Sequence, residues 1–262
     1  PGRSYVKAIE KQMSDKDCWN AKAASFPRYS QGEDTYEARM LAAARAMCAV
    51  FRNRTVLDVG CGAGMYTLRI AREARKVFAL DVSENMLDIL RKDAKSLGLH
   101  NIEYILSGWQ EYARLPACDT VFCSMSAAVR NASDRTKLLQ CRGATVVYID
   151  FAWRSPSDVM GTLYRHYDIT PKNFNDSRMM REWLDARGLA FASQKMEDKW
   201  DVAWEIEKLV DACVLTLLRH GLNADKKLIA SQLEPFKRDD GKYHEVTEFS
   251  AEILLWKNPD GE

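Results

Sequence analysis

Long apolar segments are absent from this sequence. No run reaches the roughly 18 apolar residues that a membrane-spanning helix requires. The first 20 residues are polar and charged throughout, unlike a secretory signal. We therefore expect a soluble, cytoplasmic protein without a membrane partner.

The cysteine patterns of disulfide frameworks and zinc sites are absent as well. The seven cysteines include no Cys-x-x-Cys pair, and most lie inside apolar stretches. An odd number of scattered cysteines indicates buried free thiols in a reducing compartment. Because Cys118 and Cys123 lack a second pair of ligands nearby, we predict no metal site.

The sequence has no excess of charge of either sign. Its 262 residues include 38 Lys and Arg against 37 Asp and Glu, a net charge of +1. Such a chain has no overall field to attract the phosphates of nucleic acids, although a local patch is compatible with it. Apolar side chains are abundant, at 47%. The length and this composition suit one large α/β domain, or one domain with a cap.

From residue 51 to residue 151, short apolar stretches alternate with segments of helical periodicity. The expected strands are 55–59, 76–80, 102–106, 119–124 and 144–151, and the expected helices are 65–75, 83–97 and 133–140. This alternation indicates a doubly wound parallel sheet with helices on both faces. Beyond residue 151 we expect helices at 156–167 and 178–187, a strand at 190–199, a helix from a cap at Asp201 to about His220, a helix at 225–233 and a strand at 245–256.

The stretch Val56-Leu-Asp-Val-Gly-Cys-Gly-Ala-Gly64 is the most informative segment. An expected strand leads into a turn where Gly60, Gly62 and Gly64 can adopt backbone angles that other residues avoid. Their missing Cβ atoms let a ligand lie against the backbone, near the amide groups that begin the next helix. The loop alone is also compatible with a tight strand-to-helix turn. Its Gly-x-Gly-x-Gly spacing is shorter than the dinucleotide fingerprint, which disfavours a nicotinamide-dependent oxidoreductase.

An acid ends the next expected strand at Asp81, 17 residues after Gly64. A carboxylate at this place can accept hydrogen bonds from both hydroxyls of a ribose. Asp81 could instead cap the following helix. Ser83 is a good alternative cap, however, which leaves Asp81 available for a ligand.

Leu57–Gly64, Asp81 and Met86 together resemble the first two motifs of the class I S-adenosylmethionine-dependent methyltransferases, over roughly residues 50–155. The resemblance implies a Rossmann-like α/β fold with a mostly parallel, seven-stranded sheet whose last strand is reversed. It also implies S-adenosylmethionine as cofactor and S-adenosylhomocysteine as product. The glycine loop would line methionine and ribose, Asp58 would orient the loop and the cofactor amino group, and Asp81 would hold the ribose. The residues implied are Asp58, Gly60, Cys61, Gly62, Gly64 and Asp81, with Val82 and Met86 around the adenine.

Two further family elements are matched less closely. Many members have an acid where this chain has Gly108. We therefore expect adenine recognition from the backbone of Gly108 and Trp109, or from Glu111; Trp109 as an ordinary core aromatic is the alternative. Ser124 and Met125, at the end of the fourth strand, are expected to border the sulfonium.

The N-terminal segment resembles the lead-in of small-molecule members of the family, in which aromatic residues fold over the cofactor. Trp19, Phe26 and Tyr29 are the candidates in this chain. Residues 1–50 are therefore expected to form a helical lead-in that covers the cofactor.

No catalytic residue is identified by the sequence. The leaving group of a sulfonium is neutral, so the reaction needs no acid, and it needs a base only where the acceptor atom is protonated. Weak candidates near the fifth and last strands are His166, Tyr164, Tyr243 and His244, and Asp150 and Trp153 also lie at a strand end. An exposed histidine without a chemical role is the competing interpretation.

We expect a methyltransferase core in residues 51–199 and 245–262, and a helical cap in residues 200–244, inserted before the last strand. The apolar stripe of this cap packs against the domain or forms a dimer interface, so that both a monomer and a homodimer are open. The predicted acceptor is a small molecule. The alternatives are an RNA or protein methyltransferase, disfavoured by the balanced charge and by the lack of an Asn-Pro-Pro-Tyr motif, and a non-catalytic cofactor-binding partner subunit.

Overall fold

The computed structural model describes residues 14–170 and 176–260, which divide into two compact units. The larger unit contains residues 15–152, 176–196 and 251–260, and the smaller unit contains residues 14, 153–170 and 197–250. The division falls within three long strands, β5 (Thr145–Arg154), β6 (Phe191–Trp204) and β7 (Tyr243–Lys257), so that each contributes to both units. Within the described ranges, no helix has both the length and the apolar character needed to cross a membrane.

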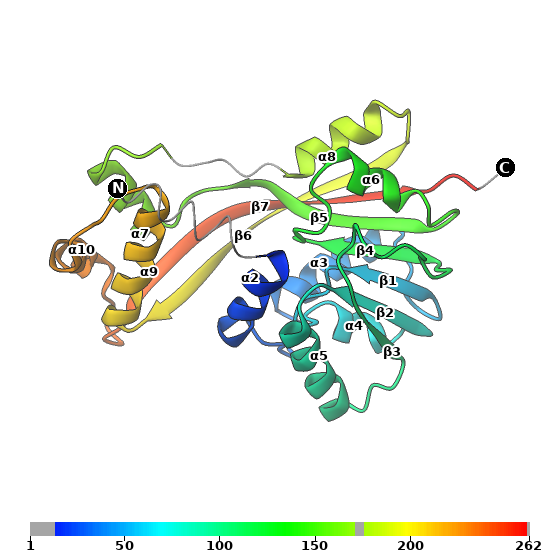
Figure 1. Ribbon diagram of the computed structural model, residues 1–262, viewed down its shortest axis with the longest axis horizontal. Helices are drawn as coiled ribbons and strands as arrows, with labels where there is room; N and C mark the ends of the chain where they lie inside the picture. The colour runs from blue at the N-terminus through cyan, green and yellow to red at the C-terminus, as the bar shows by residue number, and fades with distance from the viewer. Residues whose placement is uncertain (1–13, 171–175, 261–262) are drawn as a thin grey trace. The chain divides into compact units, whose positions relative to one another are not determined.

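The seven strands form one sheet in the order β3-β2-β1-β4-β5-β7-β6 (Figure 1). Parallel pairing links β3 (Ile102–Leu106), β2 (Lys76–Asp81), β1 (Thr55–Val59), β4 (Thr120–Ser124) and β5 in that order. This part of the sheet has the predicted parallel, doubly wound order.

The last strand is reversed. The amide of Asn258 donates to the carbonyl of Ala144 at 2.9 Å, and the amide of Ser155 donates to the carbonyl of Glu248 at 3.1 Å. Ala144 near the start of β5 thus pairs with Asn258 after the end of β7, and Ser155 after the end of β5 pairs with Glu248 within β7. The two strands therefore run antiparallel. The predicted mostly parallel, seven-stranded sheet with a reversed last strand is confirmed.

Helices cover both faces of the parallel strands. One core, around Leu57 and Val121, includes side chains of α6 (Ala132–Leu138) and α8 (Asp176–Asp185). The opposite core, around Ala79, includes side chains of α4 (Thr67–Ala71) and α5 (Glu84–Ser96). Figure 1 shows the two pairs of helices on opposite sides of the sheet. All five residues of β1 are buried, as expected for a central strand covered on both faces.

Capping side chains explain where several helices begin. Thr35 accepts a hydrogen bond from the amide of Ala38 and starts α3 (Tyr36–Ala46). The Ser83 hydroxyl accepts from the amide of Met86 at 3.2 Å and starts α5, as its sequence predicted. The helix after the glycines is shorter than expected: α4 spans Thr67–Ala71 in place of 65–75, because residues 65 and 66 still belong to the turn.

The smaller unit contains α7 (Asp158–His166), α9 (Ile206–Arg219), α10 (Lys226–Leu233) and the short 3-10 helix η2 (Glu234–Phe236). Leu163, Leu217 and Ile229, one from each α-helix, share its apolar core. Two of these helices, α9 and α10, lie in the chain between β6 and β7. That they cap the core stays a prediction.

The expected helix start at Asp201 is wrong. Residues 201–204 continue β6, and α9 begins only at Ile206. The reason is a cross-strand bond: the Asp201 carboxylate lies 2.7 Å from Nδ1 of His244 on β7 and 2.8 Å from Arg238. These partners hold residue 201 in the sheet and override its preference for a helix cap.

Candidate functional site

The turn between β1 and α4 has the backbone geometry that its glycines allow. Gly60, Gly62 and Gly64 have φ values of 72°, 53° and 86°. A Cβ atom on Gly64 would lie 2.2 Å from Cδ1 of Leu90, and one on Gly60 would lie 1.8 Å from the hydroxyl of Ser126. Side chains at Gly60 and Gly64 are therefore excluded by the packing of the turn, whereas the nearest atom to a Cβ on Gly62 would be 3.8 Å away, in the ring of Phe26.

Asp81 closes this turn from the end of β2. Its Oδ2 accepts a hydrogen bond from the amide of Gly62 at 2.8 Å, and its Oδ1 accepts from the amide of Ser83 at 2.8 Å. Burial raises the pKa of the carboxyl, and the backbone donors oppose that rise. Each oxygen retains capacity for a second donor, such as a ribose hydroxyl. Together with the cradle of glycines, this carboxylate fits the adenosyl cofactor that the resemblance implies.

Asp58 is a second carboxyl group beside the turn, and it is only 2% exposed. The pKa of Asp58 is raised to about 7, chiefly by burial. The hydrogen bond from Thr67 opposes this rise, and the charge of the nearby Asp81 adds to it. Thr67 donates to Oδ2 of Asp58 at 2.6 Å. A cationic ligand group would favour the charged form of Asp58. Cys61, within the turn, holds a neutral thiol, because burial and the two carboxyls raise its pKa.

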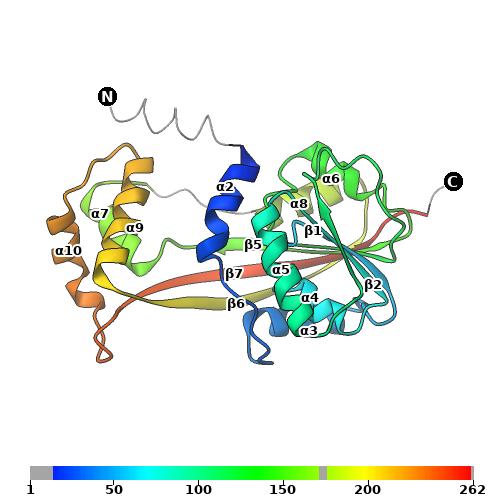
Figure 2. The same cartoon turned by 60° about the horizontal axis from the view of Figure 1, so that its bottom comes forward.

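The lead-in approaches the same turn through α2 (Asp15–Lys22) and the 3-10 helix η1 (Ala23–Ser25). Figures 1 and 2 both show α2 beside α5, at the edge of the sheet where the parallel strands end. Ala23 packs with Ala63 and Met86 in a small core that also includes the rings of Trp19 and Phe26. The structure thus brings Trp19 and Phe26 to the predicted cofactor side of the sheet.

Tyr29 occupies a different place from the other two aromatic residues of the lead-in. It packs at the edge of the core that contains Leu68 and Cys61, and the guanidinium of Arg69 lies 5.2 Å from the centre of its ring. Its hydroxyl is buried and has no hydrogen-bond partner within the described ranges.

The side chain of Trp109 belongs to the core of the larger unit. It is 1% exposed, and its Nε1 donates to the carbonyl of Asp134 at 3.0 Å. The amide of Gly108 donates to the carboxylate of Glu111 at 3.2 Å. These three predicted adenine contacts are therefore engaged within the chain, and their contact with a ligand stays a prediction.

The carboxyl end of β4 has two unusual features. Met125 adopts a left-handed conformation with φ of 45°, which is uncommon for a residue other than glycine. The Ser124 hydroxyl is buried beside Tyr66 without a regular hydrogen bond among the described residues. Strained backbone and unpaired buried polar atoms often accompany binding sites. They support the expected role of Ser124 and Met125, which stays a prediction.

The four weak catalytic candidates lie in the smaller unit, and two of them are held by carboxylates. The hydroxyl of Tyr243 donates to Glu234 at 3.0 Å. His244 bridges two acids, with Nε2 3.1 Å from Asp240 and Nδ1 2.7 Å from Asp201. Asp240 and Asp201 raise the pKa of His244 and so favour an imidazolium, which cannot accept a proton.

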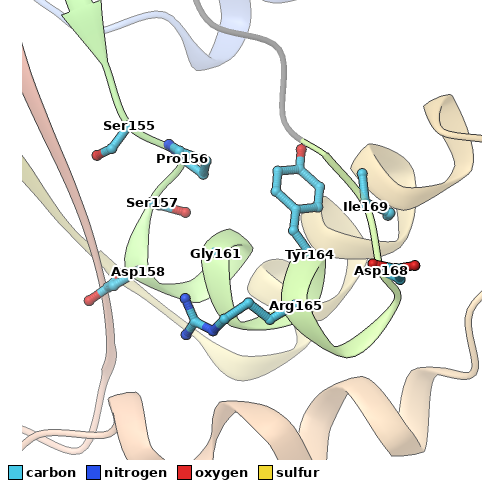
Figure 3. Close-up of a pocket in the computed structure, with 9 residues that line it drawn as sticks. All are labelled: Ser155, Pro156, Ser157, Asp158, Gly161, Tyr164, Arg165, Asp168 and Ile169. Carbon is cyan, nitrogen blue, oxygen red and sulfur yellow. The ribbon is translucent and has the colours of Figure 1, made fainter.

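Tyr164 lines a cavity of about 520 Å³ in the smaller unit, a size that suits a small organic molecule (Figure 3). Its hydroxyl lies 3.3 Å from Nε2 of His220, and burial raises its pKa. His166 is exposed and packs edge-on against Tyr167. The cavity is lined by Ser155, Pro156, Ser157, Asp158, Gly161, Tyr164, Arg165, Asp168 and Ile169. That any of the four candidates acts in catalysis stays a prediction.

Three residues that sequence reasoning missed support the site. Thr67 holds Asp58, Asn20 bonds α2 to the start of α5, and Arg69 bonds α4 to the segment before α3. A lone charged residue in the apolar stretch Thr67-Leu-Arg-Ile-Ala71 was the available signal for Arg69. Asn20 and Thr67 offered no comparable signal, because their partners lie far away in the sequence or at no characteristic spacing.

Comparison with known proteins connects this geometry to a family. Residues 56–146 match the family model described as a methyltransferase domain. An uncharacterized protein of Haemophilus influenzae is 29% identical over 133 residues, which cover 50% of this chain and 48% of that protein. A tRNA U34 carboxymethyltransferase of Shewanella baltica is 38% identical over 93 residues, covering 35% and 28%. The chain thus spans less than half the length of these relatives.

A solved structure shares the fold across nearly the whole chain. Coclaurine N-methyltransferase bound to N-methylheliamine and SAH matches with a TM-score of 0.52 and 13% identity, covering 98% of this chain and 87% of that one. At this identity the likeness shows the fold alone.

Proposed function

Because residues 56–146 form a class I S-adenosylmethionine-dependent methyltransferase domain, we propose that this chain transfers a methyl group from S-adenosylmethionine to a small-molecule acceptor. One observation carries the proposal. The glycine turn has three positive φ values, and its central amide is bonded to Asp81, the acid that ends the next strand. This arrangement places a ribose-binding carboxylate against a main chain that a ligand can approach closely.

The residues of the turn divide the binding task. Gly62 leaves room beside the main chain for the methionine and ribose parts, while Gly60 and Gly64 let the turn pack tightly against Ser126 and Leu90. Asp81 accepts the ribose hydroxyls, since the amides of Gly62 and Ser83 already orient both of its oxygens. Asp58 lies beside the turn, where a carboxylate favours the cationic amino group of the cofactor.

The bound cofactor supplies an electrophilic methyl group on a sulfonium, whose departure as a neutral thioether needs no acid. The chain therefore has to orient the acceptor atom and exclude water. Tyr66, beside Ser124 at the end of β4, is suited to orientation and not to proton abstraction, because burial raises the pKa of its phenol further above the neutral range.

One observation supports a small acceptor. The net charge of +1 provides no general attraction for nucleic acid. The partial similarity to a tRNA U34 carboxymethyltransferase favours RNA as the second candidate acceptor.

Thermal melting tests the cofactor part of this proposal. We expect S-adenosylmethionine and S-adenosylhomocysteine to raise the melting temperature and NAD to leave it unchanged, since a ligand at about 100 times its dissociation constant stabilises by about 2.7 kcal/mol. Asp81→Ala should abolish the shift, because the ribose loses its acceptor. Asp88→Ala is the matched control on the exposed face of α5, where Asp88 pairs only with Arg91 among the described residues.

Stabilisation by NAD alone would contradict the proposed function. An unchanged shift in Asp81→Ala would remove Asp81 from the binding site while leaving the cofactor assignment in place.

A further inference from the structure

Residues 15–35 of the lead-in, which we call the strap, are expected from the family resemblance to cover the cofactor. We propose that Asn20 and Arg69 are the positioning residues that hold this strap closed over the cofactor site. The proposal rests on the proposed function, because the strap controls entry to the same site. In this proposal Asn20 on the strap and Arg69 on the core control the exchange of the cofactor.

The strap covers a residue that the cofactor is expected to touch. Met86 is 1% exposed, and Ala23, Trp19 and Phe26 of the strap share its small core. Phe26 also lies 3.8 Å from the place where a Cβ of Gly62 would be. An adenine ring that packs on Met86 therefore has to displace part of the strap or enter while the strap is open.

Asn20 is the first anchor of the strap. Its side-chain oxygen accepts from the hydroxyl of Ser83 at 2.7 Å and from the amide of Asn85 at 3.2 Å. Its main-chain oxygen accepts from the side chain of Asn85 at 3.1 Å. These bonds attach α2 to the first turn of α5, two residues beyond Asp81. The side chain acts only as an acceptor in these bonds, so that an aspartate would preserve them.

Arg69 is the second anchor, and it is 9% exposed. Its Nη2 donates to the carbonyls of Ser30 at 2.5 Å and Gly32 at 2.9 Å, and to the hydroxyl of Thr35 at 2.7 Å. The guanidinium also faces the ring of Tyr29. Because Arg69 lies on α4, directly after the glycine turn, these bonds attach the C-terminal end of the strap to the wall of the site.

The strap is weakly packed apart from its anchors. Helix α2 contains no buried residue, and Ala23 of η1 is 2% exposed. The outer ion pair between Asp15 and Arg130 is exposed at both ends, and such pairs contribute little. Opening the strap therefore breaks a few polar bonds and the small apolar cluster of Trp19, Ala23 and Phe26 with Met86. This places the strap among the low-stability segments that open locally.

The test compares three proteins: the wild-type chain, Asn20→Ala and Asn20→Asp. In stopped-flow displacement of S-adenosylhomocysteine, we expect Asn20→Ala to raise the dissociation rate about tenfold, since two hydrogen bonds that hold the strap are lost. Asn20→Asp should keep the wild-type rate, because a carboxylate accepts the same bonds at a helix N-terminus. Arg69→Gln should raise the rate as Asn20→Ala does, and Arg45→Gln, which breaks an ion pair of an exposed arginine with Glu73, is its control.

Hydrogen exchange provides a readout that needs no cofactor. Amides of residues 16–35 should exchange faster in Asn20→Ala than in the wild-type chain, while those of β1, β2 and β4 stay unchanged. A wild-type dissociation rate in both Asn20→Ala and Arg69→Gln, or unchanged exchange in residues 16–35, would overturn the strap. Failure of the wild-type chain to bind S-adenosylhomocysteine at all would instead overturn the proposed function.

Discussion

Asp58 illustrates how a single residue of the site lowers the stability of the fold. Its carboxyl group is buried under the glycine turn with the hydroxyl of Thr67 as its side-chain donor. Burial of a carboxylate with so little compensation is costly, so the isolated chain favours the protonated acid. The residue thus contributes a site for a cation and reduces the stability of the ligand-free protein near neutral pH.

The pH dependence of stability should reveal this group. Its pKa is about 7 in the folded chain, against an ordinary value of 3.8. Between these values the folded state keeps a proton that the unfolded state has lost. The free energy of unfolding therefore falls as pH rises from about 4 to 7, and the contribution levels off above the folded pKa. Asp58→Asn should remove this contribution, amounting to about 1–4 kcal/mol at pH 7.5.

Urea unfolding of both proteins from pH 4.5 to 7.5 measures the effect. Titration of all other groups cancels in the difference between the two curves. The wild-type chain should lose stability relative to Asp58→Asn as the pH rises. Parallel curves would show that Asp58 titrates at its ordinary pKa.

At the scale of elements, Glu252 on β7 connects one helix and one strand to the reversed strand. Its side chain is 1% exposed. Its two oxygens accept from the hydroxyl of Ser177 on α8 at 2.7 Å and from that of Ser193 on β6 at 2.6 Å. Arg181 of α8 lies 3.6 Å from the carboxylate. This buried carboxylate therefore fixes the positions of α8 and β6 against β7.

Replacing Glu252 should cost far more than replacing one of its partners. Glu252→Ala leaves the hydroxyls of Ser177 and Ser193 without their acceptor, removes the ion-pair partner of Arg181 and creates a buried cavity. We therefore expect a loss of about 2–5 kcal/mol in the free energy of unfolding. Ser193→Ala, the matched control, removes a single hydrogen bond and should cost about 1 kcal/mol. Denaturant unfolding of both variants provides the comparison. Equal losses would show that the carboxylate contributes no more than one ordinary bond.

The whole molecule has a nearly balanced charge, and this property bears on the acceptor. A net charge of +1 over 262 residues supplies no long-range attraction for RNA. Sequence-independent RNA binding depends on clustered Lys and Arg, and it weakens steeply as salt is added. Association with RNA would therefore have to depend on a local patch.

Methyl-labelled S-adenosylmethionine can distinguish the two classes of acceptor. We expect label from a cell extract to appear in molecules that pass a filter of small cut-off, and not in precipitated RNA. Fluorescence anisotropy should give a dissociation constant for unmodified tRNA weaker than about 100 μM at physiological salt. Micromolar binding with a steep salt dependence, together with label in RNA, would favour the second candidate function.

Local patterns were sufficient for much of the fold. The strand at Thr55–Val59 has the predicted bounds, because a buried parallel strand is a short apolar run with breaks at both ends. The partly exposed strand at Ile102–Leu106 also has the predicted bounds. The glycines of the turn have the positive φ values that their spacing suggested. Asp201 shows where local patterns fail, since its cross-strand partner His244 lies 43 residues away.

The sequence by itself determined the doubly wound sheet, the glycine turn and the acid beyond it, because each depends on neighbouring residues and on backbone sterics. Tertiary structure alone decided that Asn20 meets Ser83 and that Arg69 meets Ser30 and Gly32. These contacts join residues 37 to 63 positions apart, at spacings that no local periodicity encodes. The glycine turn is thus encoded by consecutive residues, whereas the position of the proposed strap depends on the packing of the folded chain.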